Sequence, residues 1–187
     1  AGVVTRDSIC IALTYASLNE LEVMAVDVQN AYLQAPSSEK HYVVCNDDFG
    51  IKHRGKVALI RRALYGGKFA GRNYWVHMRA CMKEIGFTSC QGDPDVWMLE
   101  CTKDDGSDCW EYFLLYTDDC LVISPKGRGE KILRKEIHPK FELKEESISP
   151  PDIYLRGKMR EVTLKNGTKA WSFSSSQYLQ AAVQNIE

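Results

Sequence analysis

Apolar residues recur at helical spacing in several parts of this sequence. Residues 8–20 place them at positions i, i+3, i+4 and i+7, and Asp7 or Thr5 can cap that helix. A longer amphipathic helix follows the glycines of residues 63–71 and ends at Gly86. Its apolar face is formed by Trp75, Met78, Met82 and Ile85. Residues 129–138 predict a basic amphipathic helix, and a last helix is predicted to begin at Ser174.

Short apolar runs between turn residues predict strands. We place them at 22–28, 41–44, 56–60, 96–101, 110–116, 120–124, 141–144, 153–159, 162–164 and 171–173. Residues 36–40 (PSSEK) are typical of a turn, and 166–168 (NGT) are typical of a hairpin turn. Because helices are mixed with strands joined by hairpins, the pattern predicts an α+β fold with an antiparallel sheet and packed helices.

Composition narrows the class of protein. The chain has 187 residues, of which 44% are hydrophobic and 26% charged, so we expect a packed core rather than a disordered tail or a coiled coil. No apolar run approaches the roughly 20 residues of a spanning helix, and no signal peptide is visible, so we expect no membrane partner. The chain begins at Ala1 and ends inside a helical pattern, so we expect a piece of a longer protein. Its seven cysteines show no C-x-x-C spacing, and we expect reduced thiols.

Charge is segregated although the formal net charge is only −1. Residues 49–83 contain nine Lys or Arg and no acid, whereas residues 84–119 contain ten acids and a single base, Lys103. A basic block suits phosphates, and an acidic block suits divalent cations, although solvated loops have the same composition.

Three carboxylates stand out. Asp118 and Asp119 lie at the tip of the predicted hairpin WEYFLLY-TDD-CLVIS, where an ordinary Asp-rich turn is the simplest interpretation. Asp27 ends another apolar strand, where helix capping is the simplest interpretation. If these strands are neighbours, the three carboxylates converge and repel one another unless cations lie between them. Such oxygen ligands suit Mg²⁺, and a pair of ions supports phosphoryl transfer.

The segment IRRALYGGKFAGR (60–72) is basic and rich in glycine. Glycines let a backbone approach a ligand closely, and the cations of this segment can meet a triphosphate or a template strand. Those cations are Arg61, Arg62, Lys68 and Arg72. Taken alone, the segment also fits a loop whose glycines only set turns.

Together these blocks resemble the reverse transcriptase of copia-type LTR retrotransposons. DVQNAYLQA resembles the family's first catalytic block, RRALYGGKFAGRNYW its Leu-Tyr-Gly, Lys, Arg and Trp block, and YTDD its Tyr-x-Asp-Asp box. GFTSCQGDPDVW, FELKEES and YLRGKM resemble the Asp-Pro segment, the following strand and the primer-gripping hairpin. The blocks follow the family's order and cover most of the chain. The sequence departs from the usual family residues at Gly67, Phe69, Gly71 and Thr117.

The resemblance implies a catalytic site. Asp27, Asp118 and Asp119 match the catalytic carboxylates, the Val28 carbonyl is an additional metal ligand, and two Mg²⁺ ions, or Mn²⁺, are the implied cofactors. Tyr32 matches the aromatic gate that lies under the sugar of the incoming nucleotide and excludes a 2′-hydroxyl. Core packing is the alternative interpretation for this ring.

The resemblance also implies contacts with substrates. The nucleotide-binding residues are Tyr65, Gly66 and Lys68, together with Tyr32. The residues that contact template or primer are Arg61, Arg62, Arg72, Tyr116, Tyr154, Leu155 and Gly157. The expected partners are an RNA or DNA template with its primer, deoxynucleoside triphosphates, and the integrase and ribonuclease H parts of the parent Pol polyprotein. An intracellular location in cytoplasmic particles follows from the same resemblance.

The architecture implied is a polymerase palm with partial fingers and the start of a thumb. Residues 1–36 form the first part of the palm, 37–70 the fingers insertion, 71–173 the rest of the palm with the primer-grip hairpin, and 174–187 the start of the thumb.

The implied activity is that of an RNA-directed DNA polymerase, which transfers nucleotides to a primer 3′-OH by a two-metal mechanism. The alternative is a decayed or domesticated retroelement domain that is catalytically inactive and acts as a binding module. A different palm-type enzyme, such as a cyclase or nuclease, would use the same acids. In a ferredoxin-like binding domain, the Asp pair would be only a turn.

Overall fold

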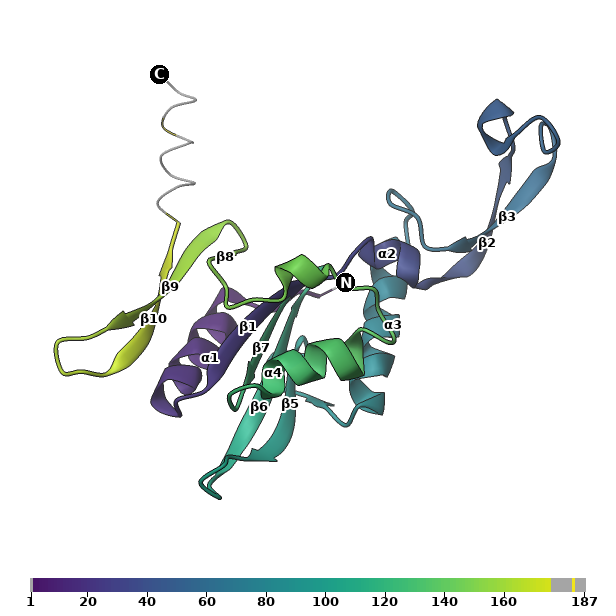
Figure 1. The fold of residues 1–187 in the computed structure, drawn as a ribbon. Coiled ribbons are helices and arrows are strands. Elements are labelled where there is room, and N and C mark those ends of the chain that lie inside the picture. The colour runs from purple at the N-terminus through teal and green to yellow at the C-terminus, as the bar shows by residue number, and fades with distance from the viewer. Residues whose placement is uncertain (1, 176–182, 184–187) are drawn as a thin grey trace.

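A five-stranded antiparallel sheet lies at the centre of the structure, a computed structural model that describes residues 2–175 and residue 183 (Figure 1). Its strand order is β1-β7-β6-β5-β4. The strands are β1 (Glu22–Asp27), β4 (Thr88–Ser89), β5 (Val96–Thr102), β6 (Asp108–Tyr116) and β7 (Asp119–Ser124). Every neighbouring pair in this sheet is antiparallel, which confirms the predicted α+β class.

Helices cover both faces of this sheet. On one face lie α3 (Ala70–Glu84) and α4 (Arg128–Lys131), which continues into the π-helix η2 (Ile132–Ile137); α1 (Arg6–Leu18) lies on the other. The sheet separates two hydrophobic cores, and successive residues of β6 point into them in turn. Phe113 packs in the core on the α3 side and Leu114 in the core on the α1 side, and both are fully buried. This two-sided burial is the reason why the strands are apolar throughout rather than alternating.

A capping hydrogen bond marks the start of α1, and a glycine follows the end of α3. Thr5 caps α1 by accepting a hydrogen bond from the Ser8 amide, and Gly86, with φ 98°, follows the end of α3. The predicted apolar face of α3 needs one correction, because Tyr74 is buried there whereas Trp75 is only half-buried. In η2 the wide π-helical turn brings three buried side chains to the core, those of Ile132, Leu133 and Ile137.

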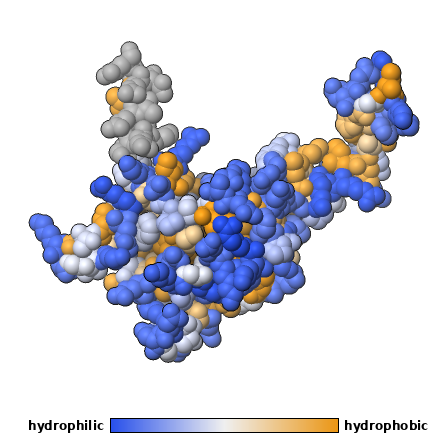
Figure 2. All heavy atoms as spheres, viewed as in Figure 1, coloured by the Kyte–Doolittle hydropathy of each residue, from blue (hydrophilic) through white to orange (hydrophobic). Residues whose placement is uncertain are grey.

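A separate hairpin projects from the rest of the molecule (Figure 1). It consists of β2 (Pro36–Val44) and β3 (Val57–Arg62), with the 3-10 turn η1 (Asp47–Phe49) in its connection. The predicted turn at residues 36–40 is wrong, because these residues begin β2; the pairing with β3 shifts register between Pro36 and His41. Figure 2 shows apolar side chains along this hairpin. Tyr42 and Val44 of β2 are exposed.

A three-stranded sheet lies beside α1. Its order is β10-β9-β8, with β8 (Ile153–Tyr154), β9 (Gly157–Thr163) and β10 (Lys169–Ser174). The predicted single strand at 153–159 is wrong, because Leu155 and Arg156 adopt φ values of 48° and 62° and form a turn inside it. The predicted hairpin turn at 166–168 is confirmed: the Leu164 amide donates to the Thr168 carbonyl across it.

Outside the three sheets, one predicted strand is absent and one short helix is additional. The predicted strand at 141–144 is wrong, because only an isolated bridge joins Leu143 to Val28 there; the 3-10 turn η3 (Glu145–Ser147) follows. The short helix α2 (Ala31–Gln34) was not predicted as a separate element. The predicted last helix lies outside the described residues, apart from its first residues and residue 183. None of the described helices has the length and apolar character needed to cross a bilayer.

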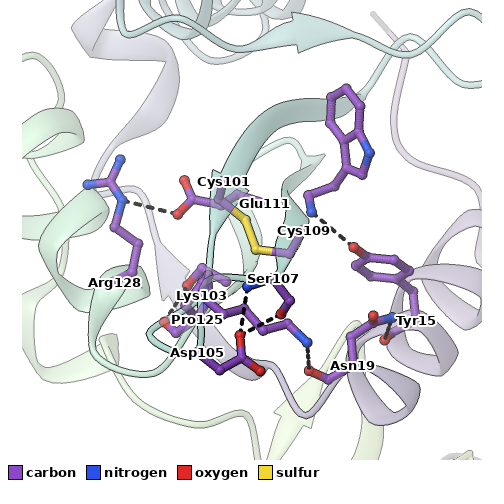
Figure 3. The surroundings of a disulfide bond; sticks show 12 residues. Tyr15, Asn19, Cys101, Lys103, Asp105, Ser107, Cys109, Glu111, Pro125 and Arg128 are labelled. Atoms are coloured by element: carbon purple, nitrogen blue, oxygen red, sulfur yellow. Dashed lines mark hydrogen bonds and ion pairs between the residues drawn. A yellow bond between two sulfur atoms is a disulfide. The ribbon is translucent and has the colours of Figure 1, made fainter.

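The expectation of reduced thiols is wrong for one pair of cysteines. Cys101 in β5 and Cys109 in β6 lie opposite each other and form a disulfide (Figure 3). Beside it, the Tyr15 hydroxyl accepts a hydrogen bond from the Trp110 amide, and the Lys103 ammonium donates to the Asn19 carbonyl. The other five cysteines are free.

Candidate active site at the β6–β7 turn

The sheet brings the predicted acids together. Asp27, the last residue of β1, lies directly opposite Asp119, the first residue of β7, and the Val28 amide donates to the Asp118 carbonyl at 2.8 Å. Directly opposed residues of an antiparallel pair have Cβ atoms about 4.5–5.5 Å apart. Burial raises the pKa of Asp119, and the carboxylates of Asp118 and Asp27 raise it further. The three acids therefore share one electrostatic site.

The turn that carries these acids is strained. Thr117 and Asp118 connect Tyr116 to Asp119, and these two outer residues pair across the hairpin. Thr117 has φ 55°, a value that is unfavourable for a β-branched residue. Positive φ at the first of two central residues is the pattern of a type II′ turn, whose twist matches the flanking strands. The rigid hairpin therefore fixes the backbone that carries Asp118.

A lysine that sequence reasoning missed offsets part of the negative charge of these acids. The Lys144 ammonium lies 2.8 Å from Oδ1 of Asp27, and the Lys144 amide donates to the Asp27 carbonyl at 3.0 Å. Lys144 lowers the pKa of Asp119, against the two neighbouring carboxylates. Its signal in the sequence, a single Lys in FELK, is indistinguishable from a surface charge before the fold is known.

The donor chemistry of this site fits a hard divalent cation. Carboxylates and a backbone carbonyl are the ligands that Mg²⁺ prefers. In the described part of the chain, no three His, Cys, Asp or Glu side chains already converge as a metal cage. One of the candidate ligand oxygens, Oδ1 of Asp27, lies against the Lys144 ammonium instead.

Tyr32 lies in an aromatic cluster beside the acids. It lies two residues after Asn30, which has the left-handed φ of 46°. The centroid of its ring lies 4.8 Å from that of Tyr65 and 5.9 Å from that of Tyr74. The ring is half-buried, so it packs against the core and also keeps an exposed part. Tyr74 was missed by sequence reasoning, although it stands four residues before the buried Met78 on the same helix face.

The predicted cations lie on the neighbouring segment. A groove of about 320 Å³ is lined by Arg62, Tyr65 and Lys68, and Gly66, with φ 84°, turns the chain between the last two. Arg72 lines an adjacent groove on the α3 side. Arg61 lies exposed on β3.

The residues predicted to grip the primer have packing partners of their own. Tyr154 is buried with Leu114 and Leu121, and burial, reinforced by the nearby Asp119 carboxylate, raises the pKa of its hydroxyl. Gly157 lies against the Phe173 ring, which leaves no room for a Cβ. Leu155 is half-buried in the turn between them, and Tyr116 is half-buried at the end of β6.

Comparison with known proteins gives one consistent result. The family described as "Reverse transcriptase (RNA-dependent DNA polymerase)" matches residues 1–187. The chain is 27% identical over 188 residues to the "Retrovirus-related Pol polyprotein from transposon TNT 1-94" of Nicotiana tabacum, and this match covers 98% of the chain. It is 32% identical over 121 residues, 64% of the chain, to the Pol polyprotein from transposon RE1 of Arabidopsis thaliana. These matches span 13% and 8% of the relatives' own lengths.

Proposed function

Because this chain belongs to the reverse transcriptase (RNA-dependent DNA polymerase) family, we propose that it is the part of a copia-type retrotransposon Pol polyprotein that extends a primer on a template. The observation that carries this proposal is the placement of Asp27 opposite Asp119 and beside the Asp118 turn. In this proposal the palm consists of residues 1–36 and 71–173. The fingers are residues 37–70, and the thumb begins with residues 174–187. The projecting β2–β3 hairpin supports the assignment of the fingers (Figure 1).

The proposed metal ligands are the side chains of Asp27, Asp118 and Asp119, with the Val28 carbonyl. Two Mg²⁺ ions, or Mn²⁺, when bound there, stabilise the attacking and leaving oxygens of nucleotidyl transfer. The chain's own part is to hold the carboxylate oxygens that bind the metal. Asp27 is held by β1, and Asp118 and Asp119 are held by a hairpin that is buried on both faces. In the absence of metal, Lys144 offsets part of the negative charge.

The aromatic and basic residues supply the proposed substrate contacts. The partly exposed ring of Tyr32, packed against Tyr65, is proposed to lie under the nucleotide sugar and to disfavour a 2′-hydroxyl. Lys68 and Arg62 share a groove with Tyr65, where a triphosphate finds two cations. Contacts to template and primer are proposed for Arg61, Arg72, Tyr116 and Leu155, so binding should weaken as salt rises.

The chain covers only a small share of the curated Pol polyproteins that it matches. We propose that it works beside integrase and ribonuclease H parts of the same polyprotein, in intracellular particles.

The test is primer extension on an RNA template with Mg²⁺ or Mn²⁺ and deoxynucleotides. The variant is Asp118→Asn with Asp119→Asn. The matched control is Asp104→Asn with Asp105→Asn, a pair of adjacent exposed aspartates in the β5–β6 turn. We expect extension by the parent and by the control, and none by the active-site variant.

Two outcomes contradict the proposal. Extension by the active-site variant would show that the activity does not depend on these acids. A folded parent chain that neither extends a primer nor binds Mn²⁺ would favour the inactive binding module instead.

A further inference from the structure

The outer edge of β1 is paired to an irregular segment rather than to a strand. β1 is an edge strand of the central sheet, since β7 is its neighbour on one side. On the free side, Ala25 and Ser149 exchange backbone hydrogen bonds, with the Ala25 amide donating at 2.8 Å and the Ser149 amide at 3.3 Å. Residues 143–149, which we call the strap, therefore pair with β1 where Asp27 ends it.

The backbone amide of Asp27 lacks the partner that a regular antiparallel pairing would give it. In an antiparallel ladder that starts from the pair Ala25–Ser149, the next hydrogen-bonded pair is Asp27 with Ser147. The strap has already turned into η3 at that point, because the Ser147 amide donates to the Lys144 carbonyl. A backbone carbonyl is thus missing where the Asp27 amide needs an acceptor.

The Ser147 hydroxyl takes the place of that carbonyl. Its Oγ accepts a hydrogen bond from the Asp27 amide at 2.9 Å and donates one to the Lys144 carbonyl at 2.6 Å. One hydroxyl therefore links the backbone of Asp27 to that of Lys144, whose ammonium meets the Asp27 carboxylate. Only a side chain that both donates and accepts at short reach can make this link.

We propose that Ser147 is a positioning residue for Asp27, which sets the orientation of this carboxylate for divalent metal. The inference rests on the proposed function, because it assigns Ser147 to the same site. Removing the hydroxyl leaves the Asp27 amide without its acceptor at the end of an edge strand. The terminal residue of β1 then rotates more freely, and a metal ligand that rotates binds its ion less tightly.

The experiment compares two substitutions of equal size. Ser147→Thr keeps the hydroxyl, whereas Ser147→Val removes it; Ser147→Ala removes it without adding volume and carries the same test where Val disturbs folding. Ser149→Ala is the control in the same strap, since Ser149 pairs with β1 through its backbone and its own hydroxyl reaches only the Ser147 carbonyl, at 3.5 Å. The readouts are amide hydrogen exchange at Asp27 without metal, Mn²⁺ binding, and the Mg²⁺ concentration that gives half-maximal primer extension.

The expected result is a shift confined to variants without the hydroxyl. Ser147→Val and Ser147→Ala should exchange the Asp27 amide faster and need about tenfold more Mg²⁺. Ser147→Thr and Ser149→Ala should stay close to the parent. An active parent whose hydroxyl-free variants keep the parent's Mg²⁺ dependence or Asp27 exchange overturns the role of Ser147. A parent that neither binds Mn²⁺ nor extends a primer instead overturns the proposed function, and the assignment of Ser147 falls with it.

Discussion

The ammonium of Lys144 lies 2.8 Å from Oδ1 of Asp27, on the carboxylate that faces Asp119 across the β1–β7 pair. The contact joins the strap to the proposed catalytic acids. The Asp27 carboxylate raises the pKa of Lys144, so this lysine stays charged across the physiological range. A positive charge therefore stands beside the oxygens that we propose as metal ligands.

Removing this charge should strengthen metal binding. We expect Lys144→Met to bind Mn²⁺ more tightly than the parent, because the repulsion between Asp27 and Asp119 is then relieved only by the ion. Titration of Mn²⁺ into the metal-free protein measures the effect. Lys140→Met is the matched control, since Lys140 pairs with Glu84 instead. Equal affinities of Lys144→Met and the parent would contradict the prediction.

Relief of strain at the β6–β7 turn should stabilise the protein. Thr117→Asn is expected to raise the free energy of unfolding by about 1 kcal/mol, because Asn tolerates the positive φ that Thr117 adopts. Thr117→Val keeps the branched Cβ and should give no gain. Urea unfolding of both variants measures the difference. A Val variant as stable as the Asn variant would show that backbone strain is not the cause.

Adding a methyl group at Gly157 should disturb the three-stranded sheet. Three atoms of the Phe173 ring lie within 2.8 Å of the position that a Cβ would take. We expect Gly157→Ala to cost roughly 1–3 kcal/mol in thermal or urea unfolding, as overpacking usually does. Gly92→Ala meets no atom within 4 Å and should be close to neutral. A second substitution, Phe173→Leu, should recover part of the loss; if it does not, ring overlap is not the reason.

Stability should depend on pH through Asp93. This residue is buried, and its carboxylate accepts hydrogen bonds from the Ser8 hydroxyl and the Thr5 amide at the start of α1. Burial raises its pKa, but the hydrogen bonds outweigh that effect and the pKa is lowered.

The carboxylate of Asp93 therefore stabilises the fold above its unfolded pKa of about 4, and this contribution is lost as pH falls through the lowered folded value. Asp93→Asn should be less stable than the parent at neutral pH, and the gap should narrow in strong acid. Urea unfolding across pH measures it. A gap that widens on acidification would contradict the assignment.

The hydroxyl of Tyr74 should be dispensable for folding although the ring is not. Within the described residues this buried hydroxyl has no hydrogen-bond partner, and burial raises its pKa strongly. We expect Tyr74→Phe to equal or exceed the parent in melting temperature. Tyr74→Leu should be less stable, since it removes ring contacts with Tyr32 and Phe141. A Phe variant that melts as early as the Leu variant would reveal a missed partner.

Regular elements could be predicted from the sequence because their apolar residues repeat with a period. The 3.6-residue spacing located α1 and α3, and the strands β5, β6 and β7 follow from apolar runs that the sheet buries on both faces. The strap could not be predicted, because a serine hydroxyl and scattered backbone bonds replace a ladder there. The β8–β9 turn was missed for a similar reason, since Leu155 and Arg156 are not residues that usually mark positive φ.

The candidate site, like the fold, could be predicted only in part from the sequence. The acids could be named from short motifs, and the sheet register then places Asp27 against Asp119. Lys144 and Ser147 could not be named, because each contacts Asp27 from a distant part of the sequence. The residues predicted to grip the primer show the reverse case: Tyr154 and Gly157 match a motif, yet the structure also gives each a packing reason to be there.

The strap has one more consequence, for solubility. An uncovered sheet edge offers unpaired amides and carbonyls to any other chain, and such edges seed aggregation. Here residues 143–149 cover the edge of β1 from Ala25 to Asp27, and β4 at the opposite edge is only two residues long. The segment that orients a proposed metal ligand thus also shields this part of the sheet edge from pairing with another chain.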